Sequence, residues 1–166
     1  MLIVGTGHRP EKLGGYSDEA IQKLEHFAYF ILRELGPTRI ISGMALGWDQ
    51  ALALAAVNLG IPFTAAIPCH NHECKWPLHS QTKYNLLLDK AADKVILAEA
   101  YSPQAMMQRN KWMVDQMSTT DLVVALWDGT SGGTSNCIAY AESSNVRILN
   151  VWEQWEIFKV MDPASF

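Results

Sequence analysis

The sequence has few of the features that are typical of secreted proteins, membrane-spanning proteins and nucleic-acid-binding proteins. Its 3 cysteines, Cys69, Cys74 and Cys137, form no CxxC pair, so no disulfide framework is expected. No apolar run reaches the roughly 18 residues of a membrane span. The apolar opening, residues 1–4, is too short for a signal-peptide core, so we expect a cytoplasmic protein. With 13 Lys and Arg against 17 Asp and Glu, the net charge of −4 gives no support for nucleic-acid binding.

Several catalytic and metal motifs are also missing. The chain has no GxSxG, HExxH or Walker A signature. Residues 69–74, Cys-His-Asn-His-Glu-Cys, carry metal-ligating side chains, but four ligands within six residues would strain a tetrahedral site. We therefore predict no metal and no resident cofactor. A lid over a ligand, using His70, His72 or Trp76, is the preferred interpretation of this segment.

What the sequence does contain is an alternation of short apolar runs and helical patterns. At 166 residues and 49% hydrophobic content it predicts one globular domain over residues 1–166, with 152–166 as a C-terminal tail. Strands are expected at 2–4, 39–41, 61–67, 94–97, 122–127 and 146–151. Helices are expected between them, at 18–35, 48–59, 80–92, 103–118 and after Thr134. This order predicts an α/β fold, a Rossmann-like three-layer α/β/α domain with a mainly parallel sheet.

The most informative stretch is 121–142, in which an apolar run, a glycine loop and an Ala-rich helix follow one another. Gly129, Gly132 and Gly133 break the chain after the strand, and Thr134 opens the helix. A glycine loop that leads into a helix N-terminus offers backbone N–H groups and the helix dipole to an anion. We interpret these residues as a phosphate cradle.

Two further glycine loops follow strands, at residues 5–10 and 42–49. Loops at the carboxyl ends of parallel strands line one crevice, so all three can share a ligand. Gly7, His8 and Arg9 are candidates from the first loop, with Arg9 suited to a bidentate phosphate contact. For Arg9 a surface salt bridge and for His8 a hydrogen-bonded structural role are the alternatives. The second loop supplies the candidates Ser42, Gly43, Met44 and Asp49.

Two carboxylates could bind a ribose hydroxyl or act as an acid/base group. Asp49 lies in the first turn of its helix, where the stabilisation of a carboxylate by the helix dipole could alone explain why an Asp is found there. Asp128 precedes Gly129, where a turn-forming Asp is the alternative. Trp48 could stack on a base but is more typical of a core.

The long helix after Pro103 combines polar residues with methionines. Arg109 to Trp112 is interpreted as a solvated turn, from which Asn110 could reach the crevice. The methionines at helical spacing favour core or a subunit interface, and with the tryptophans of the tail they indicate a homo-oligomer.

Together these motifs resemble a known family. Residues 5–10 (GTGHRP) with 12–16 (KLGGY), 42–49 (SGMALGWD), Arg109-Asn110 and 128–134 (DGTSGGT) look like the YpsA-like branch of the SLOG superfamily, which also includes DprA-type and lysine-decarboxylase-like LOG proteins. The resemblance spans residues 2–151. It implies a Rossmann-like fold, with either a nucleotide-derived ligand such as ADP-ribose or cleavage of the N-glycosidic bond of nucleoside monophosphates.

One departure from the LOG enzymes separates these two functions. Those enzymes carry a catalytic Glu soon after the glycine loop, whereas here Ser135, Asn136 and Cys137 follow and the first Glu is Glu142. Our leading hypothesis is therefore a binding module for a nucleotide or ADP-ribose-like ligand. The alternative is an N-glycosidic hydrolase in which Asp49 or Asp128 takes the place of that Glu. A third hypothesis is a protein-interaction subunit with a vestigial crevice.

Overall fold

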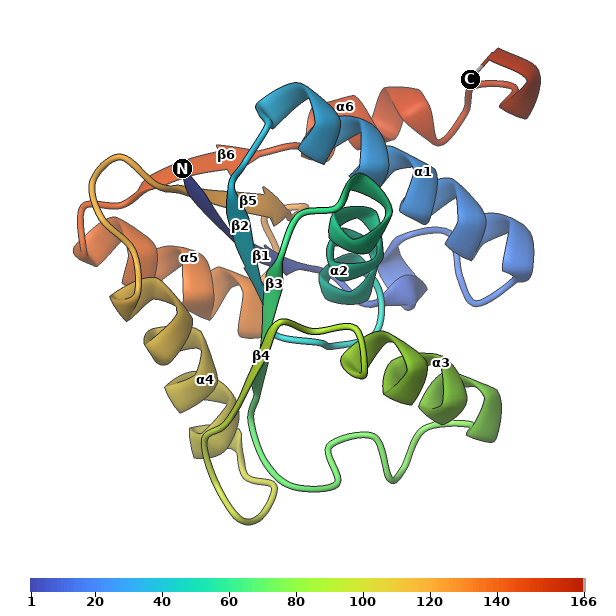
Figure 1. Cartoon of the computed structure of the whole chain (residues 1–166). Coiled ribbons are helices and arrows are strands. Elements are labelled where there is room, and N and C mark those ends of the chain that lie inside the picture. The colour runs from blue at the N-terminus through green and yellow to red at the C-terminus, as the bar shows by residue number, and fades with distance from the viewer. Residues whose placement is uncertain (166) are drawn as a thin grey trace.

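The protein is built on a six-stranded sheet in which every neighbouring pair of strands is parallel (Figure 1). The computed structural model describes residues 1–165. The strand order is β4-β3-β2-β1-β5-β6. The strands are β1 (Leu2–Gly7), β2 (Arg39–Ser42), β3 (Phe63–Ile67), β4 (Asp93–Ile96), β5 (Leu122–Leu126) and β6 (Arg147–Asn150).

Helices cover both faces of the sheet and complete the three layers (Figure 1). One core joins the sheet to α1 (Asp18–Leu35), α2 (Trp48–Leu59), α3 (Leu78–Leu88) and α6 (Trp152–Phe158). A smaller core on the other face joins it to α4 (Pro103–Asp115) and α5 (Gly133–Ser143). Short 3-10 helices span Pro10–Lys12 and Pro163–Ser165. The predicted Rossmann-like fold is confirmed, and the single-domain boundary stays a prediction.

The helix ends follow from local side-chain chemistry. The Ser17 hydroxyl accepts a hydrogen bond from the Ala20 N–H at 3.2 Å and caps α1, which ends at Gly36 in the left-handed region with φ of 56°. The Ser102 hydroxyl accepts from the Ala105 N–H at 3.0 Å, with Pro103 as the first residue of α4. These capping residues can be read from the sequence, which is why the helix starts agree with it closely.

The first glycine loop is where the local prediction was wrong. Gly5, Thr6 and Gly7 belong to β1, which continues to Gly7 and pairs with β5 up to Leu126. A Cβ added to Gly5 would lie 2.5 Å from Leu52 Cδ1, and one added to Gly7 would lie 2.5 Å from Trp48 Cδ1. The glycines are therefore required for close packing of α2 on the strand.

The long helix also differs from its prediction. Arg109 to Trp112 is not a solvated turn, because these residues lie inside α4 and Arg109 is only 5% exposed.

Among residues 1–165, none of the helices combines the length and apolar character that crossing a membrane requires.

Candidate functional site

A cavity of about 460 Å³ opens at the carboxyl ends of β1 and β5, beside the first turns of α2 and α5. From β1 the chain continues on one side through β2, β3 and β4, whereas β5 pairs on the other side, so this is the switch point of the sheet. The walls come from the β1 loop, the β2 loop, α4 and α5: Thr6, Gly7, His8, Arg9, Glu11, Lys12, Ala45, Asp49, Met106, Arg109, Asn110, Met113, Gly133 and Thr134. Residues from each of the three segments 5–10, 42–49 and 128–134 therefore line one cavity.

At the buried end of this cavity, the side chains of Asp49 and Arg109 both lie close to Gly43. A Cβ added to Gly43 would lie 2.5 Å from Arg109 Nη1 and 2.9 Å from Asp49 Oδ2. Arg109 Nη1 donates to the Gly43 carbonyl oxygen, and the Ala45 N–H donates to Asp49 Oδ2 at 3.3 Å. Asp49 Oδ1 is buried and has no hydrogen-bond partner among the described residues. Because buried carboxylate oxygens are normally hydrogen-bonded, this atom has an unused acceptor position in a residue that lines the cavity.

Burial dominates the electrostatics of this pair. It raises the pKa of Asp49 to about 6, against the opposing effects of the Arg109 charge, the Ala45 N–H and the Arg9 charge. Burial also lowers the pKa of Arg109, which the Asp49 carboxylate opposes. Asp49 thus changes protonation state just below neutral pH, within reach of a ligand.

Asn110 connects the buried pair to the first turn of α5. Its Oδ1 accepts from Arg109 Nε at 2.9 Å, and its Nδ2 donates to the Gly133 carbonyl oxygen at 3.3 Å. The first-turn N–H groups of a helix have no intrahelical acceptor, so those of Gly133 and Thr134 remain for another partner. Both residues line the cavity. Asn110 therefore links the Arg109 side chain to the positive, N-terminal end of α5.

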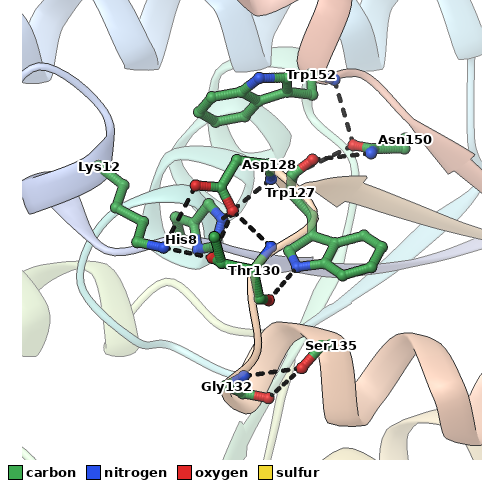
Figure 2. Close-up of polar contacts among 9 residues, drawn as sticks. All are labelled: His8, Lys12, Trp127, Asp128, Thr130, Gly132, Ser135, Asn150 and Trp152. Carbon is green, nitrogen blue, oxygen red and sulfur yellow. Dashed lines mark hydrogen bonds and ion pairs between the residues drawn. The ribbon is translucent and has the colours of Figure 1, made fainter.

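Asp128 joins the β5 loop to the β1 loop (Figure 2). Its Oδ1 lies 2.7 Å from His8 Nε2 and accepts from the Thr130 hydroxyl at 2.6 Å. Lys12 Nζ contacts both Asp128 Oδ2, at 3.3 Å, and the Thr130 hydroxyl. These bonds, with that of the Thr130 hydroxyl the largest contribution, hold the pKa of Asp128 well below its usual range. Asp128 is therefore a fixed carboxylate that positions loops.

The rest of the β5 loop is tied down by the protein itself. Asn150 Oδ1 accepts from the backbone N–H groups of Trp127 and Trp152, and Trp127 Nε1 donates to the Thr130 carbonyl oxygen at 2.7 Å. The Gly132 N–H donates to the Ser135 hydroxyl at 2.8 Å (Figure 2). The Gly132 amide is thus already engaged, and of the predicted cradle residues only Gly133 and Thr134 line the cavity.

The candidates from the sequence divide into two groups. Seven line the cavity: Gly7, His8, Arg9, Asp49, Asn110, Gly133 and Thr134. The other six do not line it: Ser42, Gly43, Met44, Asp128, Gly129 and Gly132. Ser42 shows the difference clearly, since its hydroxyl donates to the Asp49 carbonyl oxygen at 2.8 Å and accepts from the Met44 N–H at 3.1 Å. Trp48 is fully buried core, and its Nε1 donates to the Val124 carbonyl oxygen.

Sequence reasoning missed Arg109 as a site residue. The available signal was an Arg next to the chosen Asn110 within a Met-rich helix, where a charged side chain needs a specific partner. Lys12 and Glu11 were also missed, because they lie on the 3-10 turn that follows the first loop.

None of the proposed lid residues His70, His72 and Trp76 lines the cavity. His72 packs edge-on to Trp76, with ring centroids 5.0 Å apart. Burial lowers the pKa of His72 to about 4, and its Nδ1 has no partner within the described residues. A lid movement stays a prediction.

The comparison with known proteins gives one curated relative at the sequence level. The chain is 30% identical over 124 residues to the uncharacterized SPbeta prophage-derived protein YoqJ of Bacillus subtilis (strain 168), covering 64% of this chain and 70% of YoqJ. The chain belongs to the YoqJ family. No family model matches it.

The solved structure of TM1055 shows the fold of this YoqJ-family chain. The X-ray structure of TM1055, a structural genomics target, aligns with a TM-score of 0.58 at 12% identity, covering 89% of this chain and 71% of TM1055. DNA processing protein A (DprA) from Streptococcus pneumoniae aligns with a TM-score of 0.47 at 15% identity, covering 96% of this chain and 61% of DprA. The TM1055 likeness confirms the Rossmann-like fold that the motifs predict.

Proposed function

We propose that the cavity binds a nucleotide or a nucleotide-derived ligand such as ADP-ribose. The observation that carries the proposal is the pairing of a positively charged, amide-rich wall with a buried, unpartnered carboxylate oxygen in one cavity. Its volume of about 460 Å³ lies within the roughly 300–1,000 Å³ typical of small-molecule sites.

In this proposal the phosphate of the nucleotide binds at the mouth of the cavity. The N–H groups of Gly133 and Thr134 belong to the first turn of α5, at its positive end, and Arg9 and Lys12 line the same cavity. Backbone amides together with an Arg favour a phosphate, because both donate hydrogen bonds to several of its oxygens.

In this proposal the ribose of the nucleotide binds at the buried end of the cavity. Asp49 Oδ1 lacks a donor in the described part of the chain, and a ribose hydroxyl supplies one. The Arg109 guanidinium lies on the same side of Gly43 as the Asp49 carboxylate, and its charge favours the ionised form of that carboxylate. This division assigns Asp49 and Arg109 to sugar recognition and α5 to phosphate recognition.

A second candidate function, hydrolysis of the N-glycosidic bond of a nucleoside monophosphate, is favoured by one observation. With a pKa of about 6, Asp49 can hold a proton or release it near neutral pH. In this reaction water adds to the sugar carbon, the carbon–nitrogen bond breaks, and the base leaves with a proton. Asp49 would be the proton-transfer group, whereas Asp128 is held ionised and outside the cavity wall.

Calorimetric titration of the protein with AMP, ADP-ribose and NAD, combined with chromatography of the products, separates the two functions. Saturable binding without release of adenine or nicotinamide supports the binding module, and release of free base supports the hydrolase. No heat of binding with any of these nucleotides would refute both.

A point substitution tests the phosphate wall. Gly133→Asp places a carboxylate where the phosphate is proposed to bind, and a side chain there meets no atom within 4 Å, so the fold should persist. We expect binding to be lost. The matched control is Ala139→Asp, an exposed position of α5 outside the cavity, which should bind normally. Unchanged affinity in folded Gly133→Asp would show that the phosphate lies elsewhere.

A further inference from the structure

Several polar side chains on the wall of the cavity at the sheet edge are already bonded within the protein. His8 Nε2 lies 2.7 Å from Asp128 Oδ1 (Figure 2). Glu11 Oε1 accepts from the Tyr16 hydroxyl at 2.6 Å. These contacts hold the β1 loop and the turn after it, and they occupy atoms that could otherwise meet a ligand.

Both polar atoms of the Asn110 side chain also have protein partners. Its Oδ1 accepts from Arg109 Nε at 2.9 Å, and its Nδ2 donates to the Gly133 carbonyl oxygen at 3.3 Å. A side-chain amide identifies a base by presenting its oxygen and its nitrogen together to the edge of that base. Because Asn110 uses both atoms to join α4 to α5, its orientation is set by the protein and not by a base.

The cavity wall lacks a large aromatic ring on which a base could stack. Among residues 1–165, none of those that line it is a Phe, Tyr or Trp. Two methionines of α4 do line it, of which Met113 is 1% exposed and packs in the smaller core, whereas Met106 is half-buried. Met106 is therefore the methionine that an entering base can contact. Its flexible thioether adapts to rings of different size and shape.

An acceptor that remains unused in a residue of the wall is Asp49 Oδ1, for which residues 1–165 supply no donor. The Arg109 guanidinium lies beside this carboxylate at Gly43, and the charges of Arg109 and Arg9 both act on it. Neighbouring cations repel an ammonium group, so a neutral hydroxyl is the donor that suits this oxygen. A pentose supplies such hydroxyls whatever base it carries.

We propose that the cavity recognises the ribose 5-phosphate part of its ligand and accepts any nucleobase, an inference that rests on the nucleotide function proposed above. The phosphate lies at the first turn of α5, a ribose hydroxyl donates to Asp49, and the base lies against Met106. Hydrogen bonds from a site to its substrate give strong discrimination, whereas an apolar contact gives little. The ligand class is therefore nucleoside 5′-phosphates with either purine or pyrimidine bases.

Calorimetric titration of the unmodified protein with AMP, GMP, CMP, UMP, ribose 5-phosphate and 2′,3′-dideoxy-AMP tests the proposal. We expect the dissociation constants of the first four to agree within about fivefold, because a thioether contact favours all aromatic rings. Ribose 5-phosphate should bind less than about tenfold more weakly than AMP. Dideoxy-AMP, which lacks both ribose hydroxyls, should bind at least about tenfold more weakly than AMP, as for a lost hydrogen bond to a charged group.

The outcomes separate this inference from the nucleotide function itself. If AMP binds and another of the four nucleotides binds more than about fivefold more weakly or more tightly, the cavity reads the base and the inference is overturned, while the nucleotide function stands. The same holds if ribose 5-phosphate does not bind, or if dideoxy-AMP binds as tightly as AMP. No binding of any of these compounds would refute the nucleotide function and the inference with it.

A substitution with a neighbouring control tests where the base lies. Met106→Ala should weaken the binding of AMP and UMP alike, by about two- to fivefold, and leave ribose 5-phosphate unaffected. The control is Met107→Ala, because Met107 is 52% exposed and does not line the cavity. If Met106→Ala and Met107→Ala bind AMP equally well, or if Met106→Ala affects ribose 5-phosphate as much as AMP, the base does not lie against Met106.

Discussion

Gly43→Ala is the sharpest test of how the buried end of the nucleotide cavity is built. The new methyl group would lie 2.5 Å from Arg109 Nη1, 2.7 Å from Arg109 Cζ and 2.9 Å from Asp49 Oδ2. The guanidinium must therefore move by about 1 Å to reach an ordinary contact distance, which displaces it from the Gly43 carbonyl oxygen it bonds. Overpacking of this kind costs about 1–3 kcal/mol of unfolding free energy. We expect nucleotide affinity to fall roughly tenfold to a hundredfold, since misplacement by 1 Å is costly in a site that relies on orientation.

The control is Gly5→Ala, whose methyl group would lie 2.5 Å from Leu52 Cδ1 in the core, away from the cavity lining. Denaturant unfolding and calorimetric titration are measured for both variants. We expect both to lose stability and only Gly43→Ala to lose affinity. If folded Gly43→Ala binds with an unchanged dissociation constant, the Asp49 and Arg109 pair does not hold the ligand.

Two further predictions concern the carboxylates. The pKa of Asp49 is raised to about 6, from an unfolded value near 4, so its contribution to stability is complete below pH 4 and is lost as the pH rises through 6. The unfolding free energy of the wild type relative to Asp49→Asn should therefore fall by about 2.4 kcal/mol between pH 4 and pH 7.5; a difference that stays constant with pH would contradict the burial argument. Asp128→Asn should lower the melting temperature by loosening the bonds to Lys12 and Thr130, yet weaken nucleotide binding less than Asp49→Asn, as thermal unfolding and calorimetry would show. The reverse order would make Asp128 the ligand contact.

Much of the fold follows from local signals in the sequence. Ser17 and Ser102 cap helices and Gly36 ends one, and these residue types act through their nearest neighbours in the chain. The parallel sheet follows from the alternation of apolar runs and helical patterns. By contrast, the role of Gly5 depends on Leu52, which lies far away in the sequence and meets it only when α2 packs on β1.

The site residues divide in the same way, into those that local signals in the sequence reveal and those whose role depends on residues far away in the chain. The loops at strand ends identified Arg9, Asp49 and Gly133 because parallel strands bring their carboxyl ends together. Arg109 was not identified, because a side chain in the middle of a helix reveals its direction only through its distant partners, here the Gly43 carbonyl oxygen. Whether Asp128 faces a ligand or a neighbouring loop likewise depends on His8, about 120 residues earlier in the chain.

The most direct test of the central claim is an amide NMR titration of the unmodified protein with AMP and with ADP-ribose. The account predicts saturable shifts of the Gly133 and Thr134 N–H signals, accompanied by shifts at Asp49 and Arg109. Titrations to millimolar nucleotide that leave those amides unshifted, or that shift only residues outside the cavity, would contradict it.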